Sequence, residues 1–157
     1  MRKMIIGALA SLVAMTLSTT VFAQGTEAEA KAMLTKAVAA VKTDQAKAID
    51  MFNKGEGGFL DRDLYVFCSS LPDGKIVALG NQNAKQMIGT NVKALKDSTG
   101  KMYGEELLTG ELKPEGQITE VGPYMFPRPG ADKTPVQKFS FVTKASADLG
   151  CGVGYYK

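Results

Sequence analysis

The sequence predicts an α+β domain in which a five-stranded antiparallel sheet carries helices on its flanks. A stretch with helical periodicity comes first, at residues 26–54. Segments rich in β-branched and aromatic residues begin at residue 63, and short apolar groups separated by Gly and Asn interrupt them at residues 81–112. The chain therefore runs helix, two strands, a helical insertion and three strands, which is typical of an α+β architecture.

The long helix is predicted over residues 26–54 as one element. Thr26 and Glu29 match a capping box, in which the hydroxyl accepts from the Glu29 amide and the carboxylate accepts from the Thr26 amide. Good helix formers fill the interior, and Gly55 ends it. One apolar stripe recurs at helical spacing, formed by Leu34, Val38, Val41, Ala48, Ile49 and Phe52.

The segments 63–70 and 75–80 are predicted to form an antiparallel hairpin. Leu71-Pro72-Asp73-Gly74 lies between them and has turn chemistry, because Pro fixes φ and Gly accepts a positive φ. Residues 81–112 are expected to give one or two short helices over one face of the sheet. The remaining strands are predicted at residues 116–126, 136–144 and 150–156. This order of elements is also that of a PAS-like module.

The first 23 residues are expected to form a signal peptide. Two basic residues precede an apolar run from Met4 to about Val13, and Val21 and Ala23 are small residues three and one positions before a cut. Ser and Thr interrupt the end of the apolar core, which argues against a retained membrane anchor. We therefore expect an exported periplasmic protein that consists of a single domain, residues 24–157.

Composition argues against several functions. Without the leader the chain has 17 basic and 16 acidic residues, a net charge of +1 and no basic stripe, so no nucleic-acid partner is expected. His is absent, which removes Ser-His-Asp and Cys-His catalysis and the commonest zinc ligand. The two cysteines lie far apart instead of at the paired spacing of a metal site. We therefore expect a protein that is not an enzyme and holds no metal or cofactor.

Five sequence blocks follow the N-terminal helix in a recognisable series. In order they are LYVFCSSLPDGKIVALG, MIGTNVKALKDSTGK, GPYMFPRPG, PVQKFSFV and CGVGYY. The series resembles the single Cache domain of the second type, and the resemblance covers essentially all of residues 24–157. Such domains are the extracytoplasmic PAS-like sensor parts of bacterial chemoreceptors and sensor kinases. The resemblance implies a pocket between the sheet and the helical insertion for a small organic ligand, often a short carboxylic acid.

Two departures from that family affect the expected function. Family members commonly lie between membrane segments and carry a signalling module, whereas this chain stops at Lys157. We therefore expect signal transduction through a partner, either a membrane receptor or a sensor kinase. Relatives also often have Trp in the segment that matches residues 124–129, where this chain has Phe126.

Arg128 and Lys138 are the candidate residues for binding an organic anion. Arg128 lies between two prolines and suits a two-hydrogen-bond clamp on a carboxylate, the alternative being an exposed Arg of a mobile loop. Lys138 alternates with Phe139 and Phe141 along one strand, so it faces the opposite side of the sheet. On the pocket side its ammonium would pair with an anion, and on the solvent side it would be an ordinary surface residue. The resemblance favours the pocket.

Three tyrosines are further candidates for ligand binding. Tyr65 and Tyr124 are candidate hydrogen-bond donors, because a buried phenol needs a partner, and Tyr103 is a candidate for closing the pocket from the helical side. Core packing is the alternative for Tyr65, which alternates with Val66 along its strand as core aromatics do. The alternative for the whole chain is a periplasmic interaction module without a small ligand, in which the long helix pairs with its copy in a homodimer.

Cys68 and Cys151 are expected to form a disulfide. The first and last strands of a PAS-like sheet are neighbours, each strand here has one central Cys, and export favours oxidation. The bridge would close an 84-residue loop, for which the chain-entropy model gives roughly 4 kcal/mol. Two buried thiols are the alternative. In the same last strand, Gly150, Gly152 and Gly154 are expected to allow close packing.

Overall fold

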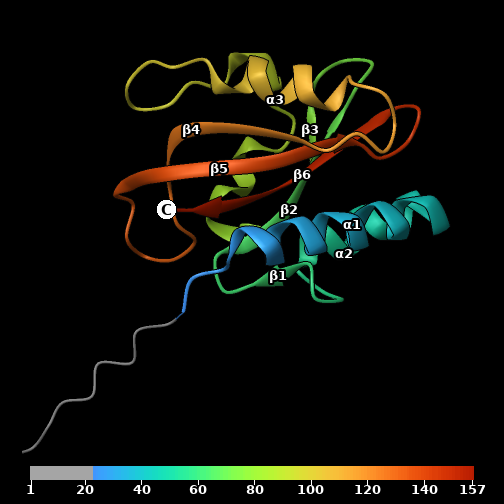
Figure 1. Ribbon diagram of the computed structural model, residues 1–157, viewed down its shortest axis with the longest axis horizontal. Coiled ribbons are helices and arrows are strands. Elements are labelled where there is room, and N and C mark those ends of the chain that lie inside the picture. The colour runs from blue at the N-terminus through green and yellow to red at the C-terminus, as the bar shows by residue number, and fades with distance from the viewer. Residues whose placement is uncertain (1–22) are drawn as a thin grey trace, which may run out of the picture.

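A computed structural model describes residues 23–157, which form a sheet with helices on both faces (Figure 1). Apart from Ala23, the predicted signal peptide lies outside these residues. The helices are α1 (Glu27–Thr43), α2 (Gln45–Lys54), the short 3₁₀ helices η1 (Gln82–Met87) and η2 (Val92–Ala94), and α3 (Tyr103–Glu111). The strands are β1 (Leu60–Asp61), β2 (Leu64–Ser70), β3 (Ile76–Leu79), β4 (Thr119–Pro127), β5 (Pro135–Lys144) and β6 (Leu149–Tyr156). Over residues 23–157, no helix is both long enough and apolar enough to cross a membrane.

The N-terminal helix is broken at Asp44, so the prediction of one continuous helix is wrong at this point. Asp44 has φ −160° and ψ 99°, and its carboxylate accepts a hydrogen bond from the Lys47 amide at 3.0 Å. A short polar side chain at the first non-helical position caps the following helix, which is why α1 stops and α2 starts here. The predicted capping box is present, with the Thr26 amide donating to the Glu29 carboxylate at 2.7 Å.

The sheet is antiparallel, with the strand order β1-β2-β6-β5-β4, and β3 also pairs with β2. The predicted hairpin of β2 and β3 is confirmed, as are the three later strands and the pairing of the first long strand with the last. The two-residue strand β1 is a sixth strand that was not predicted, because two residues are too few to show the alternation of apolar and polar residues that indicates a strand.

Helices α1 and α2 cover one face of the sheet and α3 the other (Figure 1), and each face has its own apolar cluster. One cluster joins the sheet to α1 and α2 and contains Phe139 and Phe141 from β5. The other lies under α3, η1 and η2 and contains Tyr65, Tyr103 and Tyr124. The predicted alternation along β5 therefore directs its phenylalanines toward α1 and α2, and Lys138 toward the α3 side.

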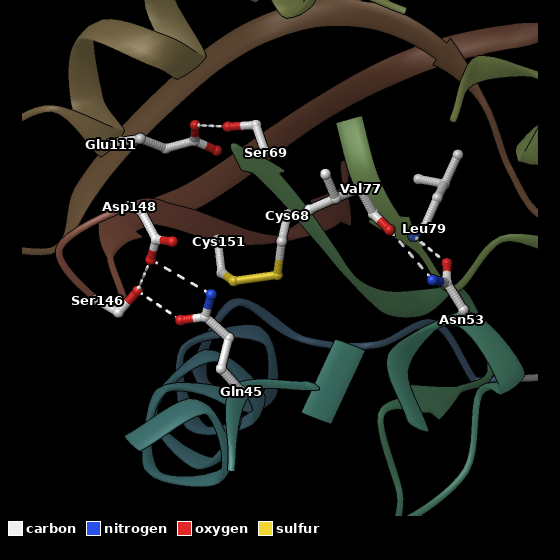
Figure 2. Close-up of a disulfide and its surroundings, with 10 residues drawn as sticks. All are labelled: Gln45, Asn53, Cys68, Ser69, Val77, Leu79, Glu111, Ser146, Asp148 and Cys151. Atoms are coloured by element: carbon white, nitrogen blue, oxygen red, sulfur yellow. Dashed lines mark hydrogen bonds between the residues drawn. A yellow bond between two sulfur atoms is a disulfide. The ribbon is translucent and has the colours of Figure 1, made fainter. Parts of the chain in front are cut away.

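A disulfide between Cys68 and Cys151 joins β2 to β6 in the middle of the sheet (Figure 2). The two residues are register partners, both are fully buried, and their sulfurs are 2.07 Å apart. Their side chains belong to the cluster under α1 and α2. Gln45 at the start of α2 is hydrogen-bonded to the β5–β6 turn, and Asn53 near its end to the backbone of β3. The helix is therefore fixed to the sheet on either side of the bridge.

Candidate ligand pocket

A small cavity lies between the sheet and the α3 layer, where the resemblance places a pocket. Its free space is about 40 Å³, which is room for a few water molecules. Strands β2, β3, β4 and β5 form one wall, while η1, α3 and the segment between η2 and α3 form the other. The lining is apolar except for one ammonium and three phenols, and consists of Tyr65, Phe67, Ile76, Leu79, Met87, Leu95, Tyr103, Leu107, Tyr124, Phe126 and Lys138.

Lys138 is the charged residue of this cavity. It is 2% exposed, and its register partners are Tyr124 on β4 and Tyr156 on β6. Its Nζ donates a hydrogen bond to the Tyr65 hydroxyl at 2.6 Å. The same Nζ lies 4.3, 4.7 and 5.1 Å from the ring centres of Tyr65, Phe126 and Tyr156, which we call the aromatic cage.

No acidic side chain among residues 23–157 forms an ion pair with Lys138. Burying an ammonium is unfavourable unless other groups replace its hydration, and the faces of aromatic rings do so only in part. An ammonium carries three donors, and the Tyr65 hydroxyl accepts one of them. The cavity therefore presents a dehydrated cation with remaining donor capacity, and this arrangement favours an anionic ligand.

Two glycines of β6 make room for the side chains that line the cavity. A Cβ on Gly154 would lie 2.1 Å from Cε of Lys138, and a Cβ on Gly152 would lie 2.3 Å from Cζ of Phe67. Any larger residue would therefore displace the Lys138 stem or the Phe67 ring. The predicted close packing of the last strand is confirmed, and these glycines make space for side chains on the pocket side.

Tyr103 and Tyr124 stack face to face beside the cage. Their ring centres are 4.3 Å apart with an interplanar angle of 2°, and the Tyr124 hydroxyl is hydrogen-bonded to the Ser140 hydroxyl at 2.7 Å. Burial raises the pKa of both phenols above the ordinary value, so both remain neutral at physiological pH. Tyr103 comes from α3 and Tyr124 from β4, so the stack bridges the two walls of the cavity.

The α3 wall is held close to the sheet by specific contacts. Gly104 lets α3 approach η2, since a Cβ at this position would lie 1.8 Å from the Val92 carbonyl oxygen. The Asp97 carboxylate accepts a hydrogen bond from the Met125 amide of β4 at 2.8 Å. Hydrogen bonds from the Thr99 side chain and the Met125 amide lower the pKa of Asp97 to about 2. This carboxylate therefore stays ionised over the physiological range.

Of the predicted site residues, the structure brings Tyr65, Tyr103, Tyr124 and Lys138 together and places Arg128 elsewhere. The Arg128 guanidinium carbon lies 5.0 Å from the Tyr156 ring centre, and its Nε lies 3.6 Å from Oδ2 of Asp63. Arg128 lines a separate surface depression with the N-terminal residues 23–24, because it follows the last residue of β4 and has left the sheet. The two predicted cations therefore do not converge on one ligand.

Sequence reasoning missed several contributors to the cavity. Tyr156 and Phe126 belong to the cage only because of the register among β4, β5 and β6, which no local pattern shows. Phe67 gave a usable signal, since it lies two positions from Tyr65 on one strand face. Nothing in the sequence except their apolar character indicated that the aliphatic residues of η1 and α3 line the cavity.

Comparisons with known proteins identify the fold. No model of a known protein family matches the sequence, and no curated protein does. Among solved structures, a methyl-accepting chemotaxis protein from Vibrio parahaemolyticus RIMD 2210633 superposes with a TM-score of 0.63 at 19% identity, covering 83% of this chain and 87% of that chain. A periplasmic sensor domain of a chemotaxis protein gives 0.57 at 20% identity, with 81% and 87% covered. A Cache chemosensory domain, studied for carboxylic acid recognition, gives 0.57 at 21% identity, with 81% and 85% covered. The chain therefore has the fold of Cache-type sensor domains.

Proposed function

We propose that this chain is an exported sensor domain that binds a short organic carboxylate in the cavity around Lys138. The observation that carries the proposal is the buried ammonium, which is 2% exposed and faces apolar space without an acidic partner among residues 23–157. A carboxylate would accept the remaining donors of Lys138, and the apolar walls would take a short carbon chain. Neutral phenols beside the ammonium suit hydrogen bonding to the carboxylate oxygens.

The fold supports the proposed sensing role. The solved neighbours include a methyl-accepting chemotaxis protein, a periplasmic sensor domain of a chemotaxis protein and a Cache chemosensory domain studied for carboxylic acid recognition. Residues 1–23 are proposed to direct export and to be removed. The bound state would be read by a partner such as a membrane receptor or a sensor kinase, and the proposal involves binding without catalysis.

A second candidate function is an interaction or dimerisation module that binds no small ligand. The small size of the cavity favours it, because about 40 Å³ of free space means that the protein's own side chains fill most of the pocket. A ligand larger than a few water molecules must displace lining side chains. Met87 and Phe126 are half-buried and are the expected residues to move.

Thermal unfolding of residues 24–157 with candidate ligands separates the two functions. Acetate, propionate, butyrate, lactate and succinate are the probes, and the corresponding amides are matched neutral controls. A ligand that binds only the folded state raises its stability by RT ln(1 + [L]/Kd), so 100 Kd of ligand adds about 2.7 kcal/mol. At least one carboxylate should raise Tm while its amide does not. No shift with any carboxylate, in a protein shown by mass spectrometry to carry no bound ligand, would favour the interaction module.

A further inference from the structure

A second polar site lies at the start of the described chain, separate from the cavity around Lys138. Asp63 immediately precedes β2 and is 8% exposed. Its Oδ1 accepts a hydrogen bond from the Gly25 amide at 2.7 Å, whereas its Oδ2 accepts none from residues 23–157. Arg128 approaches this Oδ2 to 3.6 Å without making a hydrogen bond. A buried carboxylate oxygen without a donor is unfavourable, so Oδ2 has unused capacity for one.

The backbone of residues 24–25 is held firmly against Asp63. Gly25 is buried, and a Cβ at this position would lie 2.2 Å from Cγ of Leu64. Arg62 donates to the Gln24 carbonyl oxygen at 3.3 Å and to Glu29 at 2.7 Å. Its φ of 55° is unusual for a residue with a side chain and persists only where surrounding contacts impose it. These contacts fix the position of the backbone that leads into α1.

We infer that Asp63 binds the α-ammonium group of Gln24, the group that cleavage after Ala23 creates. This inference rests on the proposed export and cleavage. The nitrogen of Gln24 is at most about 3.6 Å of chain from that of Gly25, which already contacts the same carboxylate. In the uncleaved chain the Gln24 nitrogen is a neutral amide with a single hydrogen. After cleavage it is an ammonium with three donors, and a charge-assisted hydrogen bond to Oδ2 is roughly twice as strong as a neutral one.

The charges around Asp63 are compatible with an added cation. Arg62 is paired with Glu29 and with Asp61, both at 2.7 Å, so its charge is compensated locally. Arg128 lies over the face of Tyr156 and has no other acidic partner among residues 23–157. The ammonium and Arg128 would share Oδ2 of the Asp63 carboxylate, because an ionised carboxylate oxygen accepts more than one donor. Removal of the leader would thus fasten the start of α1 to the start of β2.

The bound ammonium also has a chemical consequence. An N-terminal glutamine cyclises when its unprotonated α-amine attacks the carbon of its own side-chain amide, forming a lactam and releasing ammonia. A protonated amine has no free electron pair and does not react. An α-amine that Asp63 keeps protonated should therefore cyclise more slowly than the same amine in Asp63→Asn. The loss of ammonia is visible by mass spectrometry.

Four proteins test the inference by a double-mutant cycle. Two of them begin at Gln24 and two begin at Val21, so that they keep the native Val21-Phe22-Ala23 extension. In each pair, one protein has Asp63 and the other carries Asp63→Asn. Asn retains an acceptor for the Gly25 amide. With Asp63, a start at Gln24 should raise Tm by about 3–5 °C over the extended form, and this gain should disappear in the Asn pair. Equal gains in both pairs, or no gain with Asp63, would overturn the inference.

Two further measurements complete the test. The exported protein should begin at Gln24 by mass spectrometry, and a different first residue would overturn the inference. Ammonia loss should be faster in Asp63→Asn than in the parent, and equal rates would also overturn it. Stabilisation by acetate or propionate is measured on the same four proteins and reports on Lys138 alone. A failure of the ligand proposal is therefore distinguishable from a failure at Asp63.

Discussion

Replacing Glu111 with Gln is expected to change how the stability of the fold depends on pH. Glu111 ends α3 and is 1% exposed, and its carboxylate accepts a hydrogen bond from the Ser69 hydroxyl (Figure 2). Glu111 packs over Gly150, since a Cβ on Gly150 would lie 2.6 Å from Cβ of Glu111. Burial raises the pKa of Glu111 from its ordinary value of 4.5 to about 8, and the hydrogen bond from Ser69 opposes part of this rise.

The direction of the effect follows from where the proton is bound. Between pH 4.5 and about 8 the folded state keeps the Glu111 proton while the unfolded chain loses it. The free energy of unfolding therefore falls as pH rises through this window, by about 1.4 kcal/mol for each pH unit in its interior. Between pH 5.5 and 7.5 this is about 3 kcal/mol. A Gln side chain has no such proton and can still contact Ser69, so Glu111→Gln should lose this slope.

Urea unfolding of residues 24–157 at pH 5.5, 6.5 and 7.5 measures the difference. The stability of Glu111→Gln minus that of the parent should rise by about 3 kcal/mol over this range. Glu105→Gln, on an exposed position of the same helix, is the matched control for loss of a carboxylate. Parallel profiles for the parent and Glu111→Gln would refute the reasoning, as would an NMR titration that finds the Glu111 carboxyl ionised at pH 6.

Two further perturbations test the frame of the site. Cys68→Ala and Cys151→Ala should each lower the free energy of unfolding by up to about 4.5 kcal/mol, because the bridge spans 83 positions. The double variant should lose little more than either single variant. A Tm that reductant leaves unchanged, in protein whose two thiols are then shown by alkylation to be free, would contradict this. Gly154→Ala places a methyl group 2.1 Å from Cε of Lys138, so it should lower Tm and weaken carboxylate binding. A carboxylate affinity equal to that of the parent would show that Gly154 does not confine the Lys138 side chain.

The strands and their faces were largely readable from the sequence because they depend on local patterns. The turn around Gly74, which has φ 69°, fixed the β2–β3 hairpin, and the alternation in β5 separated Lys138 from its neighbouring phenylalanines. The break at Asp44 was missed because the apolar stripe continues across it, although Asp is itself a preferred N-cap residue. Periodicity therefore predicted the faces better than it predicted the ends of the helices.

The site was less predictable because it depends on register between strands distant in sequence. Lys138 reaches Tyr65, which lies 73 positions earlier in the sequence, because its side chain lies over Gly154, where a Cβ would block it. By chemistry alone Arg128 and Lys138 are equivalent candidates for binding an anion. The chain leaves the sheet just before Arg128, however, and the side chain lies against Asp63. A cation in a loop and a cation in a strand look alike in composition, and only the three-dimensional path of the chain distinguishes them.

Isothermal titration calorimetry on Lys138→Met and Arg128→Met tests the central claim most directly, using the carboxylate that most stabilises the parent. Met fills the aromatic cage without a charge, and losing a charge-assisted hydrogen bond costs about 1.5–3 kcal/mol, so Lys138→Met should bind at least tenfold more weakly. Arg128→Met should bind like the parent, because Arg128 lies outside the cavity lining. Unchanged affinity in Lys138→Met, or weaker binding only in Arg128→Met, would contradict the assignment of the buried ammonium as the anion site.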